Sequence, residues 1–144
     1  MSRRGGHIPR VRENPLLQRA EMKAVFPQFR FTITRGGGVE WRGPLQPTLD
    51  SPFYAIRIVH QADRSPRTYV DRPTLRADAC HRYQDGSLCL YWPAEWWWTP
   101  RESLAATIVP WTAFWLYYYE LWLVTGEWLG PSSPHRPCAG KDAA

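Results

Sequence analysis

The spacing of apolar residues changes along the chain, and the first patterned segment has the spacing of a helix. The sequence NPLLQRAEMKAVF begins with Asn14, a residue type that caps helices, and Pro15 then fits the first helical turn. The apolar side chains that follow fall mostly on one face; they are Leu16, Leu17, Ala20, Ala24 and Val25. This pattern predicts an amphipathic helix that ends before Pro27.

Apolar and polar residues then alternate with a period of two, the spacing of a strand with one buried face. The alternation covers residues 29–35 (FRFTITR) and 39–43 (VEWRG), and the three glycines between them predict a hairpin turn. It returns in residues 53–61 (FYAIRIVHQ) and, more briefly, in residues 67–73 (RTYVDRP), where Pro73 closes the strand. Four strands in a row predict an antiparallel meander.

Helical spacing returns in the last third of the chain. Thr99 is suited to cap residues 100–109 (PRESLAATIV), and Glu102 stands at the capping-box position. Pro110 can open a second helix, which Gly126 would end. The aromatic residues of this second helix recur at helical spacing and are expected in the core; they are Trp111, Trp115, Tyr118 and Trp122.

This order of elements predicts an α+β fold, in which a four-stranded sheet packs on helices at both ends of the chain. A length of 144 residues is typical of one domain with a core of its own. We expect the domain in residues 14–130, preceded by a basic flexible arm in residues 1–13. Residues 131–144 are rich in Pro, Ser and Gly and are expected to be a disordered tail.

One segment has the length of a transmembrane helix. Residues 103–124 contain a single charged residue, Glu120. However, Pro110, the run of three tyrosines and the absence of basic residues on the C-terminal side are atypical of a membrane span. We therefore expect a buried helix pair and a protein that does not span a membrane.

Charge and cysteine content limit the partners, the cellular location and the cofactors that we expect. The formal net charge is +5, but much of it lies in the first twelve residues, so no nucleic acid is expected as a partner. The three cysteines are Cys80, Cys89 and Cys138, an odd number without paired spacing. Together with the lack of a signal peptide, they favour a reducing, cytoplasmic location, with Cys80 partly buried and Cys138 a thiol of the tail. No cofactor or metal is expected, because no His/Cys cluster has ligand spacing.

The candidate chemistry lies in residues 81–92 (HRYQDGSLCLYW). Asp85 and Gly86 suit a tight turn, after which Cys89 falls on a short extended segment. His81 stands eight residues earlier, across the turn, so the two side chains could face a common groove. The spacing leaves two interpretations open, because a buried cysteine and a histidine bonded to a backbone carbonyl would fit equally well.

The same residues resemble those of the ubiquitin-conjugating enzymes, which hold a ubiquitin-like protein as a cysteine thioester. The family's Asn-Gly-x-Ile-Cys-Leu segment is matched by residues 85–90 (DGSLCL), and its Trp-x-Pro by residues 98–100 (WTP). The resemblance runs from about residue 14 to about residue 111. It implies the fold of that family and places Cys89 at the thioester position. The family's His-Pro-Asn signature is not kept, since Ala79, Cys80 and His81 stand there.

Two longer motifs narrow the resemblance. The patterns HxYxDGxLCLY, which starts at His81, and PWxxxWLxxYExWxxTGxW, which starts at Pro110, are similar to those of bacterial conjugating-enzyme-like proteins. Those proteins are encoded in cyclic-oligonucleotide antiphage (CBASS) operons. The resemblance implies a cGAS/DncV-like nucleotidyltransferase as partner, whose C-terminus forms the thioester and is then passed to an unknown acceptor.

Within this resemblance the catalytic residues are expected to be Cys89 and His81. His81 takes the place of the family's asparagine and could stabilise the oxyanion or activate the thiol. Possible accessory residues are Arg82, Tyr83 and Asp85: Arg82 could lower the pKa of Cys89, and the Tyr83 hydroxyl could donate a hydrogen bond or hold the loop. The chain has no adenylation motif, so the acyl group would arrive already activated. The alternative is a catalytically inert module of the same fold that binds and regulates the nucleotidyltransferase.

Overall fold

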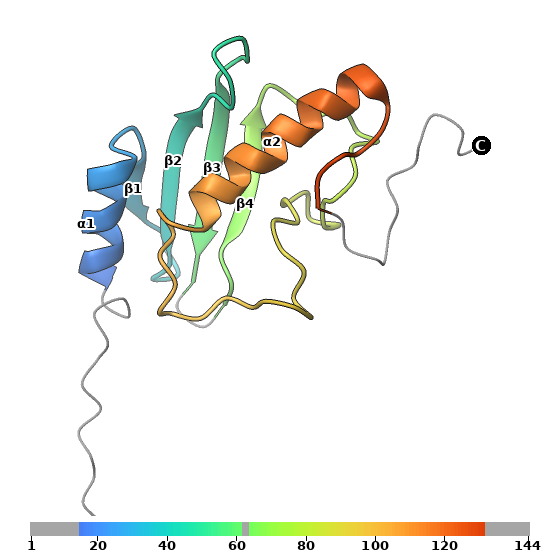
Figure 1. Cartoon of the computed structure of the whole chain (residues 1–144). Helices are drawn as coiled ribbons and strands as arrows, with labels where there is room; N and C mark the ends of the chain where they lie inside the picture. The colour runs from blue at the N-terminus through green and yellow to red at the C-terminus, as the bar shows by residue number, and fades with distance from the viewer. Residues whose placement is uncertain (1–14, 62–63, 132–144) are drawn as a thin grey trace, which may run out of the picture.

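The computed structural model describes residues 15–61 and 64–131, and Figure 1 shows how their elements are arranged. In chain order these elements are α1 (Pro15–Val25), β1 (Arg30–Ile33), β2 (Val39–Leu45), β3 (Tyr54–His60), β4 (Arg67–Arg72) and α2 (Ile108–Thr125). The strands form one antiparallel sheet in the order β1-β2-β3-β4. The predicted α+β class and the four-stranded meander are therefore confirmed.

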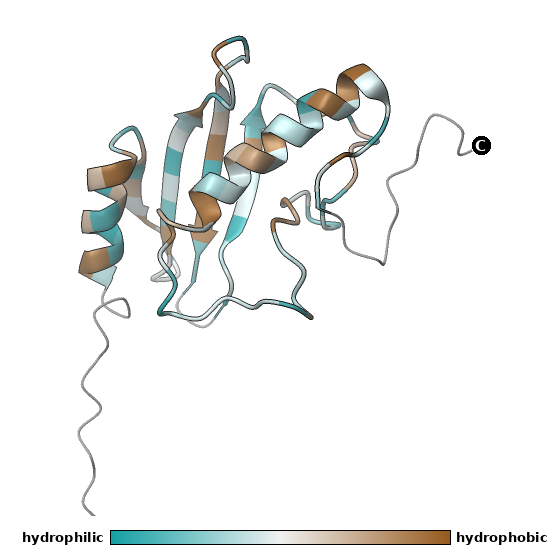
Figure 2. Ribbon diagram, in the orientation of Figure 1, coloured by the Kyte–Doolittle hydropathy of each residue, from teal (hydrophilic) through white to brown (hydrophobic). Residues whose placement is uncertain are grey.

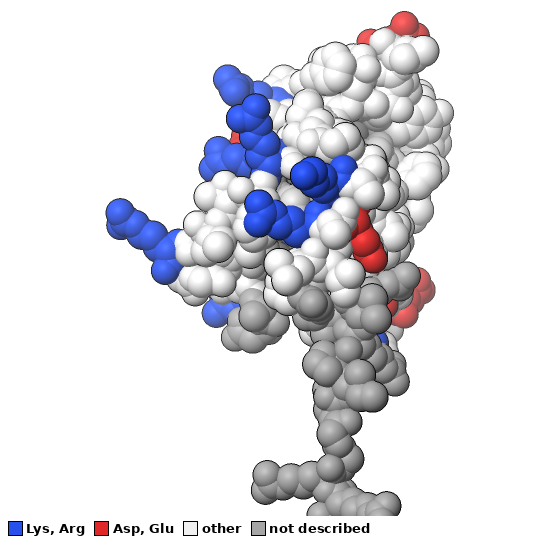
Figure 3. Space-filling model, turned by 90° about the vertical axis from the view of Figure 1, so that its left-hand side faces the viewer, with Lys and Arg blue, Asp and Glu red and all other residues white. Residues whose placement is uncertain are grey.

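The two faces of the sheet differ in chemistry because successive side chains of a strand point to opposite faces. Hydrophobic and hydrophilic residues alternate along β2 and β3 (Figure 2). On β3, Tyr54, Ile56 and Ile58 are buried, and Trp41 of β2 stands opposite Ile58. The other face carries a row of arginines, in which Arg42 of β2 stands opposite Arg30 of β1 and Arg57 of β3 in the strand register. Lys and Arg side chains gather on one side of the molecule in Figure 3.

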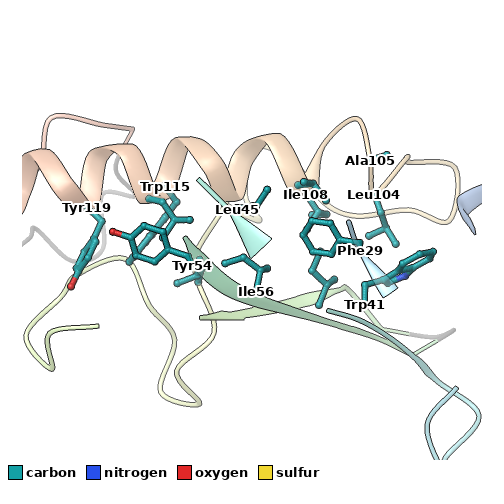
Figure 4. Close-up of a cluster of buried hydrophobic side chains, with 14 of the residues drawn as sticks. Phe29, Trp41, Leu45, Tyr54, Ile56, Leu104, Ala105, Ile108, Trp115 and Tyr119 are labelled. Atoms are coloured by element: carbon teal, nitrogen blue, oxygen red, sulfur yellow. The ribbon is translucent and has the colours of Figure 1, made fainter. Parts of the chain in front are cut away.

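The core lies between the apolar face of the sheet and α2, which crosses the sheet (Figures 1 and 4). Figure 4 shows Ile108, Trp115 and Tyr119 of α2 pointing toward side chains of the sheet. Trp115 and Trp122 are buried, as the aromatic spacing predicted, while Trp111 and Tyr118 of the same predicted set are only half-buried. The one charged residue of α2, Glu120, accepts hydrogen bonds from the Ser51 and Tyr54 hydroxyl groups at 2.7 and 3.2 Å.

The prediction of two C-terminal helices is wrong for the described residues, where α2 is the one helix that follows the sheet. Residues 100–107 form turns instead. Their polar groups bind α1: the backbone N–H of Leu104 donates to Gln18, and the Ser103 hydroxyl to Glu21. Such side-chain bonds compete with helical hydrogen bonds. Pro110 lies in the first turn of α2, where its missing N–H costs nothing.

The predicted first helix is confirmed at Pro15–Val25, but its expected apolar face is not the buried one. Leu16 and Val25 are 71% and 59% exposed, whereas Met22 is fully buried. The helix packs on the rest of the molecule around Met22, near its middle, and the apolar residues near its two ends lie outside this contact. Asn14, the arm in residues 1–13, and residues 132–144 with Cys138 lie outside the described residues.

Two further findings concern membrane crossing and cysteine chemistry. Among residues 15–61 and 64–131, no helix is both long and apolar enough to cross a bilayer. Cys80 is half-buried, as expected, and it is disulfide-bonded. Cys89 is a free cysteine.

Candidate active site

A short hairpin places Cys89 opposite His81. Arg82 and Leu88 form an isolated antiparallel bridge, and the backbone N–H of Cys89 donates to the His81 carbonyl at 2.8 Å. The turn closes at Gly86, whose φ of 87° lies in the left-handed region that glycine adopts without strain. The predicted turn is therefore present, and it brings the two predicted catalytic residues side by side.

Asp85 fixes this hairpin rather than facing the thiol. Its carboxylate accepts hydrogen bonds from the Ser87 hydroxyl and backbone N–H at 2.6 and 2.9 Å, and from Arg67 and Tyr69 of β4 at 2.9 and 3.2 Å. The Ser87 hydroxyl has the largest effect in lowering the pKa of the Asp85 carboxyl. Asp85 is not among the residues that line the cavity beside Cys89. It acts in this geometry as an anchor between the hairpin and the sheet.

The Cys89 thiol has two polar neighbours. Its Sγ atom lies 3.7 Å from the Tyr83 hydroxyl and 3.5 Å from the Tyr91 carbonyl oxygen. Burial, followed by the hydrogen bond with Cys89, raises the pKa of Tyr83 above its ordinary value. The Tyr83 hydroxyl therefore stays protonated at neutral pH, and it is able to donate a hydrogen bond once Cys89 becomes a thiolate.

Contacts of both the backbone and the ring fix the position of His81. Its φ of 56° is left-handed, and its carbonyl accepts hydrogen bonds from Cys89 and from the Trp115 indole at 3.1 Å. Its ring packs on Trp128 with centroids 4.7 Å apart. The Nε2 atom is buried and has no hydrogen-bond partner within the described part of the chain. Burial lowers the pKa of His81, so the imidazole is mostly neutral at pH 7.

Arg82 is not brought to the thiol. Its bridge to Leu88 places it on the face of the hairpin opposite to the one shared by His81 and Cys89. Leu88 is buried in the core, and Arg82 is not among the residues that line the cavity beside Cys89. The hairpin geometry therefore does not bring the Arg82 side chain to the face that carries Cys89.

A cavity of about 680 Å³ opens beside Cys89, and His81 also lines it. Eight of its thirteen lining residues are aromatic: Tyr91, Trp92, Trp96, Trp111, Phe114, Trp115, Tyr118 and Trp128. Some of these rings pack edge to face, with centroids 4.7 Å apart for Tyr91 and Trp96 and 4.8 Å apart for Trp96 and Trp111. The wall joins the segment after Cys89 to α2 and to the residues that follow α2.

Sequence reasoning missed most of this cavity. Trp98 is buried against His60 of β3 with centroids 5.4 Å apart, whereas Trp92 and Trp96 line the cavity. Glu95 and Phe114 carried no distinguishing pattern, and Trp128 stood out only as the last residue of the motif that starts at Pro110. The one available signal was the density of tryptophans directly after Cys89.

Comparison with known protein families finds a match that covers most of the chain. A family model described as the type II CBASS E2 protein matches residues 18–136, which include the hairpin, the cavity and all the strands. No curated protein matches the chain at a significant level.

Proposed function

The chain belongs to the family of type II CBASS E2 proteins, which act in antiphage defence, and we propose that it carries an acyl group as a thioester on Cys89. The acyl donor would be the C-terminus of a cGAS/DncV-like nucleotidyltransferase, and the acceptor an amine. The observation that carries this proposal is a free, half-exposed thiol that opens into a cavity beside a protonated tyrosine hydroxyl.

The first half-reaction loads the cysteine. The Cys89 thiolate attacks the activated carbonyl carbon of the donor's C-terminus, an S–C bond forms, and the activating group leaves with its electron pair. The Tyr83 hydroxyl, 3.7 Å from Sγ, donates to the thiolate and so stabilises the reactive form. In this proposal a separate activating protein supplies the high-energy donor.

The second half-reaction discharges the thioester. A neutral amine attacks the carbonyl carbon, and the carbonyl oxygen becomes an oxyanion before the C–S bond breaks. A hydrogen-bond donor at that oxygen accelerates the step. His81 is the candidate, because its neutral ring lines the cavity and its buried Nε2 lacks a partner among the described residues. An Nε2–H tautomer would leave this donor ready for the oxyanion.

A synthetic donor tests loading without the activating protein. A peptide that ends in the nucleotidyltransferase's C-terminal residues as an alkyl thioester should transfer its acyl group to the Cys89 thiolate by thiol–thioester exchange, with release of the alkyl thiol. Intact mass spectrometry should show one adduct, which added thiol removes. Cys89→Ala should abolish the adduct and leave the fold intact.

Two outcomes would contradict the proposal. An adduct of equal yield in Cys89→Ala would show that another nucleophile reacts. No adduct in the parent chain, with the donor still bound, would favour the inert module that regulates the nucleotidyltransferase by binding alone.

A further inference from the structure

The side of α2 that faces away from the sheet carries an apolar stripe. Four side chains follow one another at intervals of three, four and three residues, which places them on one line of the helix; they are Phe114, Tyr117, Leu121 and Val124. Phe114, Tyr117 and Val124 are 61%, 41% and 81% exposed, and Leu121 is half-buried. A helix that packs on one side only normally presents polar residues on the other, so this α2 stripe indicates a second contact.

The chain itself covers only the neighbouring side of α2. After the helix ends, Trp128 packs on Tyr118 and Trp115 with centroids 6.2 and 5.6 Å apart. Gly130 passes so close to Tyr118 that a Cβ atom there would lie 2.6 Å from its ring. The stripe keeps its exposure with this segment in place, so within the described residues 15–61 and 64–131 no part of the chain covers it.

The positions that flank the stripe indicate which helix it fits. Where two helices pack along an apolar seam, charged residues beside the seam select the partner. On α2 these positions hold one charged residue, Glu120, which already accepts hydrogen bonds from Ser51 and Tyr54. The others are Trp111, Ala113, Tyr118 and Thr125. The flanks therefore offer no charge that would select a different helix, and little that would repel an identical one.

The side chains of the stripe are complementary in size when two copies of α2 run antiparallel. Phe114 of one copy then meets Val124 of the other, and Tyr117 meets Leu121, so a larger side chain lies against a smaller one at each level. Antiparallel helices also bring opposite ends of their dipoles together. The arginine row lies on the far face of the sheet, so the basic surfaces of the two copies stay apart.

We propose that the α2 stripe is a dimer interface, on which a second copy of this chain packs with its own α2 antiparallel. The contact is isologous, so each residue of the stripe is used twice. One helix face per copy is small for a permanent dimer, so the dimer forms reversibly. Because Phe114 also lines the cavity beside Cys89, Val124 of the second copy stands at the edge of that cavity. The interface does not depend on the thioester chemistry.

Sedimentation velocity of the full chain tests the interface. Between about 1 and about 200 µM, a range that covers the affinity of small interfaces, the parent chain should shift from monomer to dimer. Val124→Glu should raise the dissociation constant by about 100-fold, because the symmetric contact then holds two carboxylates without partners. Val25→Glu is the matched control: Val25 is an exposed valine of the other helix, α1, and its variant should dimerise as the parent chain does.

A pair of opposite charges tests the antiparallel register. Tyr117→Glu and Leu121→Lys should each be monomeric alone. Their equimolar mixture should form a heterodimer, because the introduced carboxylate and ammonium then face each other across the contact. A variant that failed to fold could not give this rescue, and a mixture that stays monomeric while the parent chain dimerises would contradict the register.

Three results would overturn the inference. The first is a parent chain that stays monomeric throughout the concentration range, and the second is a dimer that Val124→Glu leaves intact. The third is a monomeric parent chain that binds the nucleotidyltransferase or phosphatidylcholine vesicles and loses that binding in Val124→Glu, because the stripe would then serve another protein or a lipid surface.

Discussion

The two faces of the sheet differ in polarity, although the same alternation of residues along the strands produces both. Under α2 the face is apolar, and the site beside it presents aromatic rings, one thiol and a single carboxylate. The outer face is crowded with arginines, of which Arg42, Arg57 and Arg67 pair with Glu40, Asp71 and Asp85. Most charged side chains of the outer face are therefore neutralised by a neighbour in an ion pair. The region around Cys89 has few charged side chains, so a single carboxylate or thiolate there dominates the local electrostatic potential.

The largest expected effect compares neighbours on β3. Ile58 is fully buried, whereas Val59 follows it on the outer face between Glu40 and Arg67. Ile58→Ala should lower the free energy of unfolding by about 2–5 kcal/mol, because it leaves a cavity in the core. Val59→Ala should cost about 1 kcal/mol or less. Urea unfolding of both variants measures the difference, and equal losses would mean that the outer face is also a packed interface.

His81 gives the next effect, on rate rather than stability. If it donates to the oxyanion, His81→Ala should load Cys89 normally but discharge it about 10² to 10³ times more slowly. His81→Asn restores an amide donor and should recover part of that rate. Separate time courses for loading and discharge measure this. Slow loading instead would assign His81 to activation of the thiol, and parent rates in both steps would make it structural.

Part of the fold could be predicted from the sequence, because some elements depend only on residues close together in the chain. The strands follow from a period of two that each segment carries by itself, and the turn before Cys89 follows from Asp85 and Gly86. Residues 100–107 were predicted as a helix because the capping residues are local, while the hydrogen bonds to Gln18 and Glu21 that replace the helix join residues 86 and 82 positions apart.

The cavity could not be predicted, because it depends on contacts between segments that are far apart in the sequence. Its walls join residues 81–96 to residues 111–131, which meet only after α2 packs on the sheet. Arg82 was a possible accessory residue for the thiol, but its bridge to Leu88 turns it to the other face of the hairpin. The family resemblance, in contrast, singled out Cys89 as the candidate nucleophile from the sequence alone.

A smaller effect concerns pH and the two described histidines. Burial lowers the pKa of both His60 and His81 in the folded chain. The unfolded chain therefore binds more protons below its ordinary histidine pKa of about 6.5, so stability is present above that pH and is lost as the pH falls through it. His60→Gln should flatten this dependence in urea titrations between about pH 7 and pH 5. An unchanged slope would mean that His60 is open to water when folded.

The most direct test of the central claim is a single-turnover chase. The chain is loaded at Cys89 with the peptide thioester, freed from excess donor, and mixed with a primary amine, and intact mass spectrometry follows both the chain and the peptide. The account predicts that the adduct disappears as a peptide amide appears in equal amount, with Cys89 returned as a free thiol. Release of the peptide only as its free acid, at a rate that does not depend on the amine, would contradict an acyl carrier.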